Sequence, residues 1–170
     1  MVRCPQAAAR PMHEERLTLS RNGWMPNNPR LPVRIYRGLR TATDAPFDAT
    51  AFEARFAANG WPADWRGGVY DYHHYHSSAH EVLGVAAGTA SLMLGGPDGT
   101  VVDVSAGDAL LLPVGTGHCC VRADEGFRVV GAYPQGQDWD IQRSAPDATT
   151  LERMHAVSDP RRDPVTGKRF

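Results

Sequence analysis

The sequence predicts an all-β domain, a sandwich or closed barrel of short antiparallel strands. Short apolar segments follow one another through the middle of the chain, and turn-forming residues separate them. Gly-Gly-Pro-Asp-Gly at 95–99 and Ala-Gly-Asp at 106–108 place glycine where the chain reverses and a positive φ is needed. At 170 residues the chain suits one core better than two domains. Many short strands with glycine corners are typical of a sandwich or a barrel.

The residues before this region predict a loop, a strand and a helix, in that order. Pro-Asn-Asn-Pro at 26–29 favours a loop or turn, and the β-branched and aromatic residues of 31–36 favour a strand. Asp48 is a suitable cap for a helix that carries two phenylalanines at helical spacing and ends near residue 59. We expect residues 1–67 to form an N-terminal extension packed on the barrel.

The barrel core is expected to span residues 68–133. Its predicted strands are 69–76, 81–86, 91–94, 101–104, 109–112, 118–122 and 127–133. Residues 134–170 are expected to wrap over the surface of the same domain, with a short helix near 149–155. The charged tail from residue 158 is more typical of solvated charge than of a binding patch.

Composition argues against several partners and locations. A formal net charge of −1 provides no positive field for nucleic acid or anionic lipid. The longest apolar stretch, 109–114, is too short for a transmembrane helix, and the alanine run at 7–9 is too short for a signal peptide. The three cysteines, Cys4, Cys119 and Cys120, are an odd number and two are adjacent, which favours a reducing compartment. We expect a cytoplasmic protein.

A group of metal-ligand residues stands out in the predicted core. His74 and His76 are two apart on a predicted strand, so they share a face, whereas His73 faces the other way. Glu81 begins the next predicted strand, and His118 would reach the same pocket only in a closed barrel. Two histidines with one carboxylate leave coordination positions open, as in non-haem iron oxygenases, and also suit Mn, Ni, Co or Zn.

This pattern is similar to that of the cupin superfamily, whose two motifs are both present. The first is Gly68, five residues, His74-x-His76, four residues, Glu81, six residues and Gly88. The second is Gly107, five residues, Pro113-x-Gly115, two residues and His118, with Arg122 where the family usually has Asn. Residues 26–33, 74–84 and 131–140 further resemble the YjlB-type branch of small bacterial cupins.

The resemblance implies an RmlC-like jelly-roll barrel, or double-stranded β-helix, with an N-terminal strand and one or two short flanking helices. It also implies a divalent metal, Fe, Mn, Ni or Zn, held by His74, His76, Glu81 and His118. A three-residue gap after His76 would nominate His80 in place of Glu81. The distance to Gly88 favours Glu81, and His80 would then face outward.

Several neighbouring residues have two possible interpretations, packing in the core or a role in the site. Tyr70 and Tyr72 share the predicted facing of the two histidines, so they either line the pocket or pack in the core. Arg122 and Cys120 share the predicted facing of His118. Arg122 would suit a carboxylate-bearing ligand, and Cys120 is read as a small buried residue. Tyr72 and Arg122 are thus the candidate catalytic residues. The four tryptophans, Trp24, Trp61, Trp65 and Trp139, are interpreted as packing anchors.

Two functions are compatible with these residues. One is an enzyme that binds a small organic acid or polyol at the metal and acts as a dioxygenase, isomerase or decarboxylase. The other is a non-catalytic cupin that binds or senses a metabolite. Since no helix-turn-helix pattern or basic surface accompanies the barrel, a DNA-binding regulator is not expected. A homodimer is expected, paired through the strand at 31–36.

Overall fold

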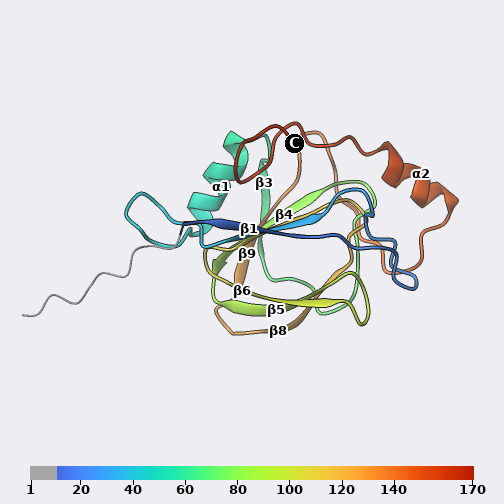
Figure 1. Cartoon of the computed structure of the whole chain (residues 1–170), viewed down its shortest axis with the longest axis horizontal. Coiled ribbons are helices and arrows are strands. Elements are labelled where there is room, and N and C mark those ends of the chain that lie inside the picture. Colours follow the sequence, from blue (N-terminus) through green and yellow to red (C-terminus); the bar gives the residue numbers. More distant parts are fainter. Residues whose placement is uncertain (1–10) are drawn as a thin grey trace, which may run out of the picture.

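A computed structural model describes residues 11–170 of the protein, and within this range two antiparallel β-sheets pack face to face (Figure 1). The larger sheet has the order β1-β2-β7-β4-β9-β3 and the smaller sheet the order β6-β5-β8. The larger sheet contains β1 (His13–Leu17), β2 (Val33–Arg37), β3 (Ala63–Gly67), β4 (Glu81–Ala87), β7 (Ala109–Leu112) and β9 (Arg128–Ala132). The smaller sheet contains β5 (Thr89–Leu94), β6 (Thr100–Ser105) and β8 (His118–Ala123). This is the jelly-roll arrangement that the sequence predicted.

The larger sheet is buried on both faces. Leu83 and Val85 of β4 point into the core between the sheets, whereas Val82 points to the other face, which helix α1 (Ala49–Ala58) covers. Gly84 makes this close cover possible, because a Cβ there would lie 2.5 Å from the ring of Phe52. Asp48 caps the helix by accepting a hydrogen bond from the amide of residue 51, as predicted.

The segment predicted as the strand 69–76 is a loop between β3 and β4. It makes two isolated bridges, His74 with His118 and Tyr75 with Gln142. Because these partners come from different parts of the chain, no continuous ladder forms along the segment. At these bridges successive side chains still point to opposite faces. Tyr75 therefore points away from the face of His74 and His76, and its hydroxyl donates to the carbonyl of Ser144. The strands β1 and β3 were not predicted.

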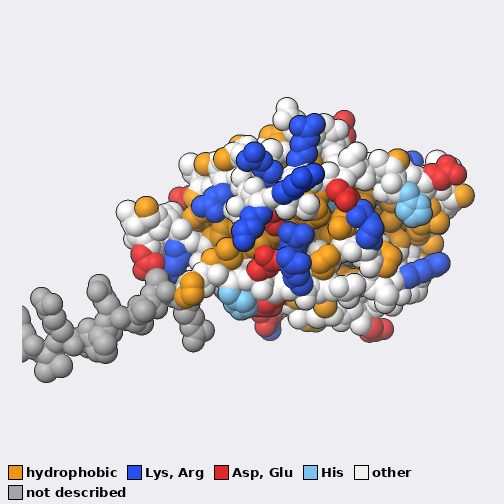
Figure 2. Space-filling view, turned by 45° about the horizontal axis from the view of Figure 1, so that its top comes forward, with side chains coloured by type: hydrophobic (Ala, Val, Ile, Leu, Met, Phe, Trp, Pro, Cys, Tyr) orange, Lys and Arg blue, Asp and Glu red, His pale blue; other side chains and the backbone are white. Residues whose placement is uncertain are grey.

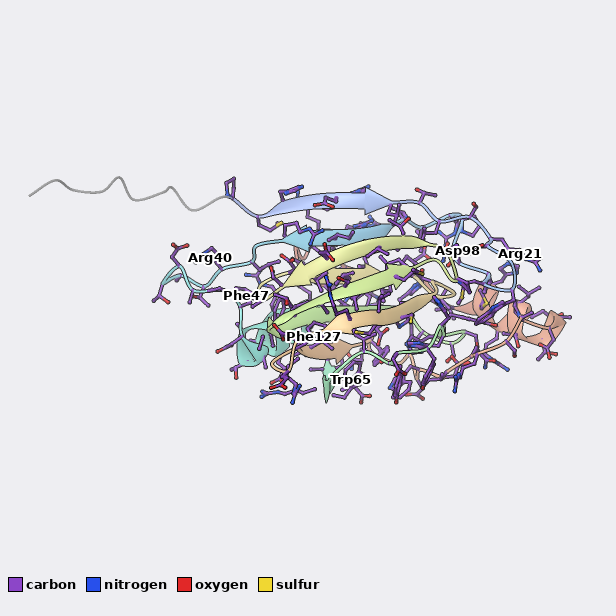
Figure 3. The ribbon with its side chains drawn as sticks, turned by 90° about the horizontal axis from the view of Figure 1, so that it is seen from below. Arg21, Arg40, Phe47, Trp65, Asp98 and Phe127 are labelled. Atoms are coloured by element: carbon purple, nitrogen blue, oxygen red, sulfur yellow. The ribbon has the colours of Figure 1, made fainter. Side chains whose placement is uncertain are left out.

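The strand predicted at 31–36 exists as β2, but it cannot pair with a second chain as predicted. It lies between β1 and β7 and forms a ladder with each. The edges of the larger sheet are β1 and β3, and Trp65 marks β3 at one side of the layered strands in Figure 3. The homodimer was predicted to pair through this strand, and β2 has no free edge for such pairing.

The C-terminal segment includes α2 (Ala148–Ala156), close to the predicted helix, and then a tail that is partly buried. Asp163 is 1% exposed and accepts hydrogen bonds from Arg34 Nη1 and the Tyr36 hydroxyl. Trp61 Nε1 donates to the carbonyl of Arg162. The tail was expected to be solvated charge rather than a binding patch, and Asp163 departs from this because it is buried. Figure 2 shows many exposed Lys and Arg side chains on one face of the molecule.

Two sequence expectations concern features outside these elements. Cys4 and the alanine run at 7–9 lie outside the described residues, while Cys119 and Cys120 are free thiols. Within residues 11–170 no helix has the length and apolar character needed to span a membrane.

Candidate metal centre

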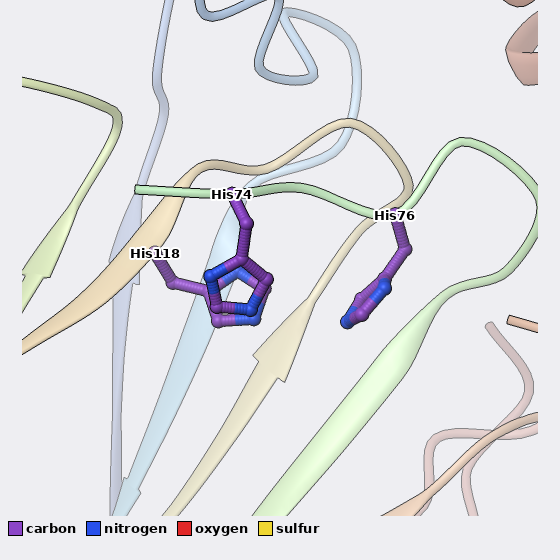
Figure 4. Close-up of side chains that lie close together, drawn as sticks. All are labelled: His74, His76 and His118. Atoms are coloured by element: carbon purple, nitrogen blue, oxygen red, sulfur yellow. The ribbon is translucent and has the colours of Figure 1, made fainter. Parts of the chain in front are cut away.

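Four side chains from three parts of the chain meet between the two sheets. His74 and His76 lie on the loop before β4, Glu81 is the first residue of β4, and His118 is the first residue of β8. Figure 4 shows the three imidazoles turned into one space, and their ligand atoms lie within 4.8 Å of one another. Glu81 Oε2 is 3.0 Å from His76 Nε2 and 3.2 Å from His118 Nε2. All four side chains are buried.

Hydrogen bonds to the backbone fix the orientation of all three imidazoles. Each ring places Nδ1 against a carbonyl oxygen, which accepts only, so Nδ1 carries the proton and donates it. The carbonyls are those of Tyr72 for His74 at 2.9 Å, Thr116 for His118 at 3.0 Å, and Asp140 for His76. Nε2 of each ring is consequently left facing the centre, which is the arrangement of histidines that ligate metals.

Asp140 holds the loop that carries His76. Its carboxylate accepts hydrogen bonds from the Ser77 amide at 2.6 Å, from the Ser77 hydroxyl and from Gln142 Nε2 at 2.9 Å. Arg153 Nη1 lies 3.6 Å from the same carboxylate. Burial raises the pKa of Asp140, but the hydrogen bonds from Ser77 and Gln142 lower it by more, so the group stays ionised.

Two aromatic residues position Glu81. The hydroxyl of Tyr133 donates to Glu81 Oε1 at 2.7 Å, and Trp65 Nε1 donates to the Tyr133 hydroxyl at 2.8 Å. Burial and the nearby Glu81 raise the pKa of Tyr133, which keeps its hydroxyl protonated and able to donate. Trp65 lies directly against β9 because residue 131 is glycine, where a Cβ would be 2.2 Å from the indole ring.

The charges of the centre favour a cation. Burial raises the pKa of Glu81, but His76 and His118 hold it well below its usual value, so Glu81 is a carboxylate. Burial and the neighbouring His118 lower the pKa of His74 to about 3, which leaves this ring neutral. Burial lowers the pKa of His76, but Glu81 raises it by more. A negative carboxylate among imidazoles is the donor set that divalent transition metals prefer.

The spacing of the donor atoms fits one ion. Two ligands that are each about 2.1 Å from a shared metal lie about 3.0 to 3.4 Å from each other, in octahedral or tetrahedral geometry. The observed distances of 3.0 and 3.2 Å from Glu81 Oε2 to His76 and His118 fall within this range. Glu81, His76 and His118 therefore have the spacing of ligands that share one divalent ion, and His74 belongs to the same group of three imidazoles.

His80, the alternative third ligand, points elsewhere. Its Nδ1 accepts a hydrogen bond from the Val114 amide at 2.9 Å, and its Nε2 lies 3.2 Å from the carbonyl of Ser158. Burial lowers the pKa of His80 to about 4, so the ring is neutral and Nε2 carries the proton it donates. Both ring nitrogens thus hold chain segments together, and Glu81 is the residue that enters the centre.

A cavity of about 390 Å³ opens onto the four residues. Tyr70 lines it and lies edge-on to His74, with ring centroids 5.5 Å apart. Tyr72 does not line it: its ring stacks on Tyr70 at 4.8 Å, and the guanidinium of Arg143 lies over its other side. The backbone carbonyl of Tyr72, rather than its hydroxyl, contacts the centre.

Arg122 is not brought to this cavity. In the pairing of β5 with β8, Cys120 lies opposite Leu92 and Arg122 lies opposite Ser91. Val121 is the extra residue of a β-bulge between these two pairs. Arg122 consequently lies on the outer face and lines a second groove with Ser91. Cys120 is half-buried and packs against the core between the sheets, as expected.

The residues that support the ligands were missed by sequence reasoning. Trp65 and Trp139, interpreted as packing anchors, line the cavity, and Tyr133 was not singled out. Trp139 Nε1 donates to Asp64 Oδ2 at 2.8 Å, and its ring lies parallel to that of Tyr133. No spacing rule connects Tyr133 to Glu81, which is 52 residues away, because only the pairing of β4 with β9 brings them together.

Comparisons with known proteins show what the chain resembles. No protein-family model matches the chain. It is 36% identical over 150 residues to the uncharacterized protein YjlB of Bacillus subtilis (strain 168), covering 87% of both chains. Similar solved structures include procruciferin, an 11S globulin from Brassica napus, with 18% identity, a TM-score of 0.41 and coverage of 65% of this chain and 27% of that one. A cupin 2 domain-containing protein from Halorhodospira halophila has 16% identity, a TM-score of 0.32 and coverage of 89% and 81%.

Proposed function

We propose that the chain, which belongs to the family of the uncharacterized protein YjlB, binds one divalent metal ion through His74, His76, Glu81 and His118. The observation that carries this proposal is the orientation of the rings: three Nδ1–carbonyl hydrogen bonds leave three Nε2 atoms in one space, and the Glu81 carboxylate lies beside two of them. In a metal-free protein this arrangement costs free energy, because charged and polar groups are buried together. A bound cation compensates the charge of Glu81.

We further propose that the site acts on a small organic substrate. A bound ion would supply Lewis acidity and, if it is iron, the redox chemistry of a dioxygenase; without redox chemistry, isomerisation or decarboxylation is the fitting reaction class. The four candidate ligands are buried at the base of a cavity of about 390 Å³, which is large enough for a small molecule. Tyr133 and Trp65 keep Glu81 in one orientation during any reaction.

One observation also favours a non-catalytic, metabolite-binding function. Apart from the metal-binding residues, few side chains around the cavity are free to move a proton. Asp64 already accepts a hydrogen bond from Trp139, and the Tyr133 hydroxyl donates to Glu81. The free thiols of Cys119 and Cys120 support a reducing, cytoplasmic location for either function.

Metal analysis of protein purified without chelators tests the proposal. We expect one divalent ion per chain in the wild type and none in the double variant His74→Ala, His118→Ala, which should stay folded because sheet packing holds the core. His80→Gln is the matched control, since it alters a buried histidine outside the centre, and it should keep its metal. Retention of the ion in the double variant would refute the ligand assignment.

The two functions are then separated with the metal-loaded protein. Consumption of O₂ or conversion of a small organic substrate, lost in Glu81→Gln, supports an enzyme. Tight binding of a metabolite with no turnover supports the binding protein.

A further inference from the structure

We propose that the cavity takes a flat aromatic molecule whose outer end is neutral or positively charged, and that it discriminates against small polycarboxylates. The inference rests on the proposed function at one point: the inner end of the ligand is placed at the four metal-binding residues.

Aromatic rings line the cavity beside the histidines. Tyr70 lies edge-on to His74, and Trp139 lies edge-on to His76 with centroids 5.8 Å apart. The rings of Trp139 and Tyr133 are parallel within 17°. Gly67 and Gly68 line the wall between Trp65 and Tyr70 without adding side chains. The lining of the cavity is therefore rich in aromatic rings, which suits a planar ligand.

The exposure of two of these rings supports a role in binding. Tyr70 is 50% exposed and Trp139 is 37% exposed, and both are among the few large apolar side chains exposed within residues 11–170. Both lie on the same cavity. Exposed aromatic groups that gather at one opening mark a contact surface, since a ligand that covers them removes apolar area from water.

The charges at the cavity disfavour an anion. Among residues 11–170, its acidic lining residues are Glu81 and Asp64, and Arg66 is the one Lys or Arg that lines it. The Arg66 guanidinium is engaged by Glu53, to which both Nε and Nη2 donate. Arg143 is stacked on Tyr72 and does not line the cavity. A second carboxylate on a ligand would therefore meet Asp64 rather than a free cation, whereas a positive or hydrogen-bond-donating end would be attracted.

The size of the cavity limits the ligand to one or two rings. A volume of about 390 Å³ corresponds to roughly thirteen water molecules at about 30 Å³ each. This lies at the small end of ligand pockets.

A first test does not depend on a metal. Binding of phenethylamine, phenylacetate and butylamine to chelator-treated protein is measured by saturation-transfer NMR titration. We expect phenethylamine to bind at least severalfold more tightly than the other two, and Trp139→Leu to remove most of this preference. Leu151→Ala, which changes an exposed apolar residue on α2, should leave it intact. Equal binding of all three probes, tighter binding of phenylacetate, or an unchanged preference in Trp139→Leu would overturn the proposal.

A second test uses the metal-loaded protein and probes with the same chelating group. Benzohydroxamate should bind about tenfold more tightly than acetohydroxamate, and Trp139→Leu should reduce this ratio by about two- to tenfold, the range of aromatic contact energies. A 4-aminomethyl substituent should be tolerated better than a 4-carboxylate. A preparation that takes up no metal contradicts the proposed metal function, and the first test then decides the ligand class alone.

Discussion

The hydrogen bond from Tyr133 to Glu81 gives a sharp test of how the centre is built. Tyr133→Phe removes one hydroxyl and keeps the ring that stacks on Trp139. The change leaves Glu81 Oε1, which is buried, without its donor, and Trp65 Nε1, which is partly buried, without its acceptor. We expect a folded protein with a weakened metal centre.

The size of the effect follows from the two bonds that are lost. A hydrogen bond to a charged group contributes about 1.5 to 3 kcal/mol, and a factor of ten in affinity corresponds to about 1.4 kcal/mol. If the bond is lost mainly from the metal-bound state, affinity for the metal falls about 10- to 100-fold, the range found for residues that support metal ligands.

The affinity is measured by competition for Zn²⁺ with a chromophoric chelator, beside urea unfolding of the metal-free proteins. Tyr72→Phe is the matched control, because within residues 11–170 its hydroxyl has no hydrogen-bond partner, whereas its ring lies beside His74. The control should bind metal within about twofold of the wild type. Equal metal affinity in Tyr133→Phe and the wild type would refute the positioning role of Tyr133.

Three further substitutions test the fold around the centre. His80→Gln should lower the free energy of unfolding by about 1 to 3 kcal/mol, measured in urea, since one buried and one partly buried hydrogen bond are weakened, while the metal content stays unchanged. Gly84→Ala should destabilise by about 1 to 3 kcal/mol through the clash with Phe52, and a midpoint equal to that of the wild type would contradict the close packing of α1. Asp163→Asn should lower stability by about 3 kcal/mol because Arg34 loses its buried partner; an effect below about 0.5 kcal/mol would show that the tail contributes little.

The fold was predictable where local chemistry decides it. Alternating apolar residues gave most core strands, and the glycines at 95–99 and 106–108 marked two chain reversals that the structure contains. The segment 69–76 has strand-forming residues but no single partner to pair with, so it became a loop. Strand pairing depends on distant residues, so the pairing of β1 with β2 could not be predicted from either segment alone.

The residues of the site were predictable to different degrees. The four candidate ligands follow a spacing that survives the change from strand to loop, since the bridge of His74 to His118 preserves the local alternation. The supporting residues were not predictable, because Tyr133 reaches Glu81 only through the pairing of β9 with β4. The prediction for Arg122 was wrong for another reason. A single β-bulge turned its side chain to the opposite face of the sheet, and nothing in the sequence around it indicates that bulge.

The central claim is that four side chains grip one cation, and anomalous diffraction from a crystal of metal-loaded protein tests it most directly. The account predicts one anomalous peak per chain, about 2.1 Å from Nε2 of His74, His76 and His118 and from a carboxylate oxygen of Glu81. A peak bound by His80 or by surface groups, or no peak in protein soaked with Zn²⁺, Mn²⁺ or Ni²⁺, would contradict it.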